Sequence, residues 1–248
     1  MNEIKISEIF GPSIQGEGPN VGARCIFVRV KGCDFKCDFC DSKFTWNDHR
    51  LNCTTYQPDE LAAYLINRCS ETNCKRIVIT GGNPCLYDFT SVLSALEREG
   101  ILADIETQGS LFPEWLSQID TLVFSPKPPS SKMPDVYLKL ICYLTSKLSF
   151  MNRTVAIKIP VFTEEDIEFA RKYSQFVNDF NKAGEGHIVK MYLSVGNSDV
   201  TTRESIRDRV LLDYERLLNI INNDPKHFEN VYLLPQLHTL VWGNKQGV

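Results

Sequence analysis

The sequence has no apolar run approaching the roughly 18 residues that a helix needs to cross a bilayer, so we expect no membrane segment. Its first ten residues place acids inside an apolar pattern and contain no continuous apolar core, which argues against a secretory signal peptide. No low-complexity stretch or change in composition divides the 248 residues. We therefore expect a single domain over residues 1–248.

A strong net charge of either sign is also missing. Lys and Arg number 27 against 31 Asp and Glu, and the resulting net charge of -4 argues against a broad nucleic-acid-binding face. Nine cysteines without a secretion signal indicate a reducing compartment, and an odd number fits poorly with complete disulfide pairing. The expected location is the cytoplasm.

What the sequence does have is a regular alternation of strand and helix patterns. Strands are expected over residues 4–10, 24–31, 76–80, 103–107, 121–124, 155–159, 187–194 and 231–234. Helices are expected over residues 58–72, 88–100, 135–150, 164–183 and 203–223. The glycine- and proline-rich residues 11–22 are predicted to form a loop. This alternation predicts an α/β fold built from right-handed βαβ units around a parallel sheet.

Polar and glycine-rich segments follow five of these strands. They are residues 32–42, 81–84, 106–109, 125–127 and 194–197. The C-terminal ends of parallel strands meet at one mouth of a barrel, where ligands bind. One ligand cavity at that mouth accounts for all five segments, whereas five unrelated turns would each need a separate reason.

Three cysteines, Cys33, Cys37 and Cys40, stand at the spacing C-x3-C-x2-C directly after a predicted buried strand. Thiolates suit zinc and iron–sulfur clusters. A zinc site or a ferredoxin-type cluster would need a fourth ligand, for which His49 and Cys53 are the nearest candidates. A cubane cluster held by only three cysteines leaves one iron for another ligand, and buried thiols without a metal are the remaining alternative. The other six cysteines are best explained as packing residues.

The loop at residues 11–22 places Gln15 and Glu17 among glycines. Amide and carboxylate groups can recognise a polar heterocycle, and glycine lets the backbone approach a ligand closely. A plain surface turn explains the same residues.

The cysteine spacing, with Phe39 before the last cysteine, resembles the radical S-adenosylmethionine (SAM) superfamily. The turn Gly81-Gly82-Asn83-Pro84 resembles the second signature of that superfamily. The resemblance implies a partial TIM-like βα barrel, a [4Fe–4S] cluster, and SAM chelated to the iron that lacks a cysteine. It also implies reductive cleavage of SAM to a 5′-deoxyadenosyl radical.

Further segments resemble the 7-carboxy-7-deazaguanine synthase family within this superfamily. They are residues 14–18, 29–33, 40–42, 80–84, 106–109, 125–127 and 234–238. The resemblance implies a carbon–nitrogen lyase of queuosine and 7-deazapurine biosynthesis, with an N-terminal substrate loop and a C-terminal extension. Such a lyase contracts the ring of 6-carboxy-5,6,7,8-tetrahydropterin to 7-carboxy-7-deazaguanine and releases ammonia, while SAM is regenerated. It further implies Mg²⁺, a flavodoxin or ferredoxin as electron donor, and a homodimer that binds neither nucleic acid nor membrane.

The same resemblance implies a role for individual positions. The cluster would be held by Cys33, Cys37 and Cys40, and Mg²⁺ by Ser42. SAM would be bound by Phe39, Cys40, Asp41, Gly82, Ser125, Pro126, Lys127, Gly196 and Asn197. The pterin would be bound by Ile14, Gln15, Gly16, Arg29, Thr80 and Val248, with the Arg29 guanidinium paired to the substrate carboxylate.

Alternatives remain open for several of these positions and for the whole chain. Arg29 could be a structural ion-pair partner, and Glu106 and His238 could support neighbouring groups or carry protons. A glycyl-radical activating enzyme shares the cysteine spacing, and a metal-stapled interaction domain would need no catalysis. Metal analysis, SAM cleavage and turnover of the pterin separate these three classes.

Overall fold

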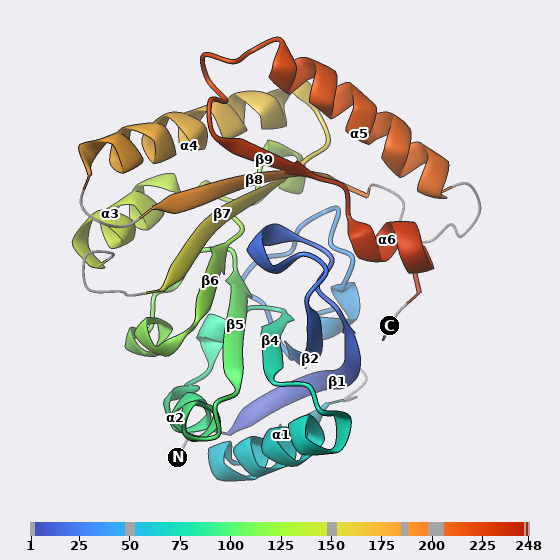
Figure 1. The fold of residues 1–248 in the computed structure, drawn as a ribbon, viewed down its shortest axis with the longest axis vertical. Helices are drawn as coiled ribbons and strands as arrows, with labels where there is room; N and C mark the ends of the chain where they lie inside the picture. Colours follow the sequence, from blue (N-terminus) through green and yellow to red (C-terminus); the bar gives the residue numbers. More distant parts are fainter. Residues whose placement is uncertain are drawn as a thin grey trace.

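Nine strands pair into one sheet in the order β3-β1-β2-β4-β5-β6-β7-β8-β9 (Figure 1). The computed structural model describes residues 3–47, 53–147, 153–184, 188–197, 206–245 and 247. The strands are β1 (Ile4–Ile14), β2 (Arg24–Val30), β3 (Thr54–Tyr56), β4 (Arg76–Gly81), β5 (Leu102–Thr107), β6 (Thr121–Phe124), β7 (Thr154–Val161), β8 (Val189–Val195) and β9 (Val231–Leu234). The α-helices are α1 (Pro58–Thr72), α2 (Thr90–Arg98), α3 (Tyr137–Lys147), α4 (Glu164–Ala183), α5 (Ile206–Asn222) and α6 (Leu237–Trp242).

Every neighbouring pair from β2 to β9 is parallel, whereas β1 runs antiparallel to both β2 and β3. The sheet curves into an arc, and α1 to α5 lie along its outer side (Figure 1). Its two edges, β3 and β9, are not paired with each other. The prediction of a partial βα barrel is therefore confirmed.

The period-2 alternation of the strands separates the core from the site. In β4, Ile77 and Ile79 face outward into the main hydrophobic core, while Val78 and Thr80 face the inside of the arc. The same alternation holds in β7, where Ile157 and Ile159 join the core and Lys158 points inward. Thr80 and Lys158 thus face one shared space from two different strands.

Most predicted elements match the structure, with some differences at their ends. The bounds of α1, α4, β6 and β9 are as expected, and α2 begins only at Thr90, where the Asp88 carboxylate accepts from its backbone N–H. The predicted ends at 148–150, 187 and 203–205 lie outside the described residues. Strand β3 and helix α6 were not predicted, because each is too short to show a period.

Strand β1 corrects the prediction of a loop over residues 11–22. It continues to Ile14, and its pairing with β2 shifts register between Phe10 and Ser13. That irregularity accommodates Gly11, whose φ of +111° is costly for other residues. The Arg68 side chain of α1 donates to the Gly11 carbonyl at 2.9 Å. The true loop of this hairpin is therefore shorter, from Gln15 to Ala23.

The hairpin loop fills the inside of the arc rather than extending into solvent (Figure 1). Its ends are joined by a 2.8 Å bond from the Gln15 N–H to the Ala23 carbonyl. Asn20 in the loop donates 2.8 Å to Asp104 and 3.0 Å to Thr121, on β5 and β6. The N–H of Leu237, at the start of α6, donates to the Gly16 carbonyl. The loop and α6 together occupy the space that a closed barrel would fill with further strands.

Helix α1 buries Leu61, Ala62, Leu65 and Cys69 against the sheet. Tyr64 belongs to the same face by period but is 43% exposed. Among the described residues, no helix combines the length and the apolar character needed to cross a membrane.

We expect Leu65→Ala to lower the free energy of unfolding by about 2–5 kcal/mol, because a fully buried leucine leaves a cavity when it is truncated. The neighbouring change Tyr64→Ala should cost distinctly less, because much of that ring already contacts water. Urea titration followed by circular dichroism measures both. Equal losses for the two variants would contradict the assigned face of α1.

Candidate active site

A cavity of about 260 Å³ opens at the C-terminal ends of the parallel strands, between the cysteine loop, the hairpin loop and α6. Sixteen of the predicted site residues line it. They are Ile14, Gln15, Gly16, Arg29, Cys33, Cys37, Phe39, Cys40, Asp41, Ser42, Thr80, Gly82, Ser125, Lys127, Gly196 and Asn197. Pro126 is buried and lies outside the lining, and Val248 lies outside the described residues. The structure thus brings together residues from both ends of the chain.

The three cysteines of the motif face this cavity from one loop. Cys33, Cys37 and Cys40 belong to a small hydrophobic cluster with Phe35 and Val136. Burial raises the pKa of the Cys37 thiol to about 11 and also raises that of Cys33, while the Lys127 ammonium opposes both shifts. In the described part of the chain, no three His, Cys, Asp or Glu side chains converge closely enough to hold a single metal ion. A cubane places its ligands on separate irons, so it needs thiols that face one space.

Hydrogen-bond donors approach the sulfurs of the motif. The Phe35 N–H lies 3.4 Å from Sγ of Cys33, and Nε2 of Gln108 lies 3.8 Å from the same atom. The indole Nε1 of Trp46 lies 3.4 Å from Sγ of Cys40. Such donors are characteristic of the surroundings of cluster thiolates, so the donor set fits an iron–sulfur cluster.

Asn83 is a fully buried side chain that connects three loops at this mouth. Its amide donates to Asp34 of the cysteine loop at 2.8 Å and to Ser110 at 3.2 Å. Its carbonyl accepts from the Thr107 hydroxyl and from the Cys85 N–H. All its hydrogen-bonding capacity is thus used within the protein, and the cysteine loop is fixed to the ends of β4 and β5.

Gly82 permits the close approach of the same two loops. A Cβ atom at Gly82 would lie 1.7 Å from the carbonyl oxygen of Gly32, a distance that no side chain tolerates. The Gly82 N–H donates to the Val30 carbonyl, and the Asn83 N–H donates to the Gly32 carbonyl. The glycine signature after β4 therefore serves packing against the cysteine loop as well as ligand access.

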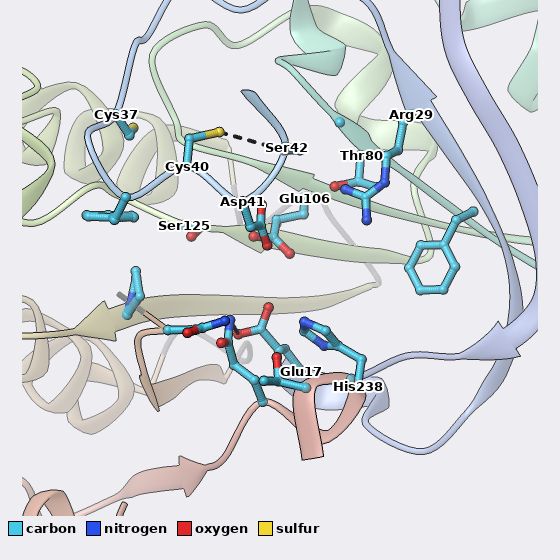
Figure 2. Close-up of a pocket in the computed structure, with 18 of the residues that line it drawn as sticks. Glu17, Arg29, Cys37, Cys40, Asp41, Ser42, Thr80, Glu106, Ser125 and His238 are labelled. Atoms are coloured by element: carbon cyan, nitrogen blue, oxygen red, sulfur yellow. Dashed lines mark hydrogen bonds between the residues drawn. The ribbon is translucent and has the colours of Figure 1, made fainter. Parts of the chain in front are cut away.

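Arg29 enters the cavity from β2 and already has an anionic partner. Its Nε lies 2.9 Å from Glu8 on the neighbouring strand, an ion pair outside hydrogen-bond geometry. The guanidinium lies over the Phe10 ring, 5.5 Å from its centroid. Its two terminal nitrogens bond to no described residue, and the group points into the cavity beside Thr80 (Figure 2). The structure therefore supports both interpretations of Arg29, as an ion-pair partner and as a free anion-binding fork.

A buried ion cluster forms the opposite wall. The ammonium of Lys158, on β7, lies 2.9 Å from Glu17 of the hairpin loop and 2.7 Å from Glu106 at the end of β5. Glu17 also accepts from Gln236, and it lies beside His238 on α6 (Figure 2). Lys158 is only 4% exposed, so both carboxylates compensate the cost of burying its charge.

The titration of Glu17 reflects this setting. Burial alone would raise its pKa, but the charges of Lys158 and His238 and the hydrogen bonds from Lys158 and Gln236 outweigh burial and lower the pKa to about 2. Burial opposes the charge of Lys158, and the two carboxylates reverse that effect and raise its pKa. Glu17 and Lys158 are therefore both ionised at neutral pH.

The remaining wall holds residues predicted to contact SAM. Phe39 of the cysteine loop stacks on Phe162, with ring centroids 4.3 Å apart. A Cβ at Gly196 would lie 2.1 Å from the Phe162 ring, so a side chain there would displace that ring from its present place. Lys127 donates to the Ser125 hydroxyl at 2.9 Å, which keeps its ammonium at the cavity. These contacts form a partly aromatic pocket beside the cysteines.

Ser42, the predicted magnesium ligand, lines the cavity next to the motif. Its hydroxyl lies 3.7 Å from Sγ of Cys40 (Figure 2). Its side chain is buried, whereas neighbouring Asp41, which also lines the cavity, is exposed. A Mg²⁺ ion commonly takes only one or two protein ligands and completes its shell with water and substrate, so a single hydroxyl is compatible with such a site.

Sequence reasoning missed Glu8, Phe10, Trp46 and Lys158 as cavity residues. Lys158 had a visible signal, since it interrupts the apolar strand Thr154–Val161, where an unpaired lysine is rarely buried. Glu8 and Phe10 had none, because their position depends on the pairing of β1 with β2.

The low pKa of Glu17 leads to a prediction about the stability of the fold in acid. The pKa of Glu17 falls from an ordinary value of 4.5 to about 2 on folding. The ionised carboxylate therefore stabilises the folded state fully above pH 4.5, and this stabilisation is lost as the pH falls from there towards 2. The loss of unfolding free energy caused by Glu17→Gln should therefore shrink between about pH 6 and about pH 3.5. Urea titrations across that range measure it.

The matched control is Glu229→Gln, which removes one partner of the exposed pair Lys182–Glu229. Exposed pairs contribute little, so its effect should be small throughout. A Glu17→Gln effect that stays the same at every pH would contradict a buried, ionised Glu17.

Known proteins can now be compared with this geometry. The Radical SAM superfamily profile matches residues 27–125, which contain both the cysteine loop and the glycine turn. A solved structure titled QueE, from Escherichia coli, is similar to this protein with a TM-score of 0.66 and 24% sequence identity. The match covers 95% of this chain and 95% of the Escherichia coli chain. That likeness supports the fold.

Relatives from several organisms carry the name 7-carboxy-7-deazaguanine synthase, and two of them match over the whole chain. The protein of Bacillus subtilis (strain 168) is 38% identical over 249 residues, covering 99% of this chain and 98% of the relative. The protein of Bacillus cereus is 39% identical over 252 residues and covers both chains completely. With similarity of this extent, the chain belongs to the 7-carboxy-7-deazaguanine synthase family of the radical SAM superfamily.

Proposed function

We propose that this protein is a carbon–nitrogen lyase that contracts the ring of 6-carboxytetrahydropterin to 7-carboxy-7-deazaguanine and releases ammonia, in queuosine and 7-deazapurine biosynthesis. The observation that carries the proposal is one cavity with two chemically different halves. One half presents three thiols, and the other presents the Arg29 guanidinium on one wall and the Lys158 ion cluster on the wall opposite.

The thiol half fits the cluster and SAM. Cys33, Cys37 and Cys40 would hold the [4Fe–4S] cluster, which with SAM supplies the electron and the 5′-deoxyadenosyl radical. The Gly82 carbonyl accepts no hydrogen bond from the described residues and is available to the amino group of SAM. The remaining SAM contacts are assigned to Phe39, Asp41, Ser125, Pro126, Lys127, Gly196 and Asn197.

The other half suits an anionic heterocycle. Arg29 offers its two terminal nitrogens to the carboxylate of the pterin, in the planar fork that suits bidentate pairing. Thr80 pairs with Arg29 across β2 and β4 and supplies a hydroxyl. Ile14, Gln15 and Gly16 line the cavity and, with Val248, are assigned to the pterin. Phe10 and Phe27 stack on each other and provide an apolar surface for a flat ring.

Several parts of the proposal concern groups beyond this chain. Ser42 would hold Mg²⁺ through its hydroxyl, with water and substrate as the other ligands. The electron donor would be a flavodoxin or ferredoxin, and the enzyme would work as a homodimer in the cytoplasm. All nine cysteines are free, as cluster chemistry in a reducing compartment requires.

Removal of one cluster ligand should abolish both cluster and turnover. We expect Cys37→Ala to lose its iron and sulfide after anaerobic reconstitution and to produce no 7-carboxy-7-deazaguanine, because two thiolates do not retain a cubane. Iron and sulfide analysis and chromatography of the product measure this. The control Cys142→Ala, which removes an exposed cysteine of α3, should retain both.

A Cys37→Ala protein that keeps four irons and full turnover would overturn the cluster assignment. Zinc bound in place of iron by the unchanged protein would favour an interaction domain. Reductive SAM cleavage without turnover of the pterin would favour an activating enzyme.

Arg29 should contribute binding energy only to substrates that carry a carboxylate. We expect Arg29→Gln to weaken binding of 6-carboxypterin by about 1.5–3 kcal/mol, the usual range for a hydrogen bond to a charged group. Binding of pterin itself, which lacks the carboxylate, should change little. Anaerobic calorimetry with both ligands measures the difference, and Arg153→Gln, which breaks a distant ion pair with Asp120, is the control. Equal losses for the two ligands would assign Arg29 a purely structural role.

A further inference from the structure

The segment after the cysteine motif folds back onto the motif itself. Ser42 precedes a short 3-10 turn, Lys43–Thr45, in which both the N–H and the hydroxyl of Thr45 donate to the Ser42 carbonyl, at 2.9 and 2.8 Å. Thr45 is fully buried, and its carbonyl accepts from the Gly32 N–H at the start of the motif. The two ends of the cysteine loop are therefore bonded to each other.

This turn determines where Trp46 lies. Its backbone N–H donates to the Lys43 carbonyl at 3.1 Å. The ammonium of Lys31, the residue that follows β2, donates to the Phe44 carbonyl at 2.9 Å. The indole is thereby brought against the last cysteine of the motif, with Nε1 3.4 Å from Sγ of Cys40. An indole N–H can only donate, so the sulfur is the acceptor.

We propose that Trp46 is a positioning residue for the cluster: its indole N–H donates to the Cys40 sulfur and makes the cluster easier to reduce. A hydrogen bond to a thiolate sulfur withdraws negative charge from it, which stabilises the reduced cluster more than the oxidised one and raises the reduction potential. The inference depends on the proposed function, because it needs the cluster at Cys33, Cys37 and Cys40.

The donor at Cys40 differs from those at Cys33. Cys33 receives a backbone N–H and the Gln108 amide, and that amide also donates to Asp34 at 2.6 Å. A change at Gln108 would therefore disturb the loop itself. Trp46 donates to sulfur through one ring atom, so a single substitution can remove the N–H and keep an aromatic ring.

The test compares two tryptophans that undergo the same change. Trp46→Phe removes the indole donor to Cys40 and leaves the Ser42 hydroxyl in place, whereas Trp115→Phe removes an indole N–H that donates 3.0 Å to the Tyr87 carbonyl. After anaerobic reconstitution, the cluster potential of each protein is measured by a redox titration followed by electron paramagnetic resonance. We expect a more negative potential for Trp46→Phe, an unchanged one for Trp115→Phe, and four irons per chain in both.

A kinetic readout should accompany the shift. The rate of SAM cleavage by Trp46→Phe should fall several-fold when reduced flavodoxin is the electron donor. It should recover with an excess of a stronger reductant such as titanium(III) citrate. A purely structural defect would lower cleavage equally with both reductants. The Trp115→Phe protein should show the same ratio between reductants as the unchanged protein.

Should Trp46→Phe fail to hold four irons, benzothienylalanine is placed at position 46 instead, since it keeps the bicyclic shape and replaces the N–H with sulfur. The same negative shift is expected for this protein. Equal potentials for the unchanged protein and the variant that holds the cluster would overturn the role of Trp46. An unchanged protein that assembles no iron–sulfur cluster would instead overturn the proposed function.

Discussion

The ammonium of Lys158 joins three parts of the chain that lie far apart in the sequence. It lies in the middle of β7, yet its partners are Glu17 in the N-terminal hairpin loop and Glu106 at the end of β5. Removal of any one charge would leave another buried without compensation, which is among the costlier defects in a protein interior. One wall of the cavity therefore depends on this ion cluster.

The open barrel explains why such a cluster is needed. A closed barrel fills its interior with layers of side chains from its own strands. Here β3 and β9 are unpaired edges, and the interior is occupied by a loop with polar backbone and by the short helix α6. Hydrogen bonds such as those from Asn20 to Asp104 and from Leu237 to Gly16 take the place of the strand-to-strand bonds that would close a barrel. The cavity of about 260 Å³ opens beside this loop and helix.

The sequence predicted the parts of this molecule whose signals are local. Helix α1 and strand β6 follow from hydrophobic period and capping residues, and the cysteine motif and the glycine turn after β4 are contiguous patterns. The Lys158 cluster could not be predicted, because its partners lie 141 and 52 residues away and meet only through the fold. The extension of β1 to Ile14 was hidden by Gly11 and Pro12, whose turn-forming character is overridden by pairing with β2.

The hairpin loop also gives the two halves of the cavity different histories during synthesis. In the described part of the chain, the contacts that hold the cysteine loop come from residues as far along as Ser131, Met133 and Phe162, so this loop has its partners once about two thirds of the chain has been made. Lys158 becomes available to Glu17 at the same stage, whereas Gln236 becomes available only after nearly the whole chain has emerged. The cysteine loop can thus be in place before the hairpin loop has its contacts with α6.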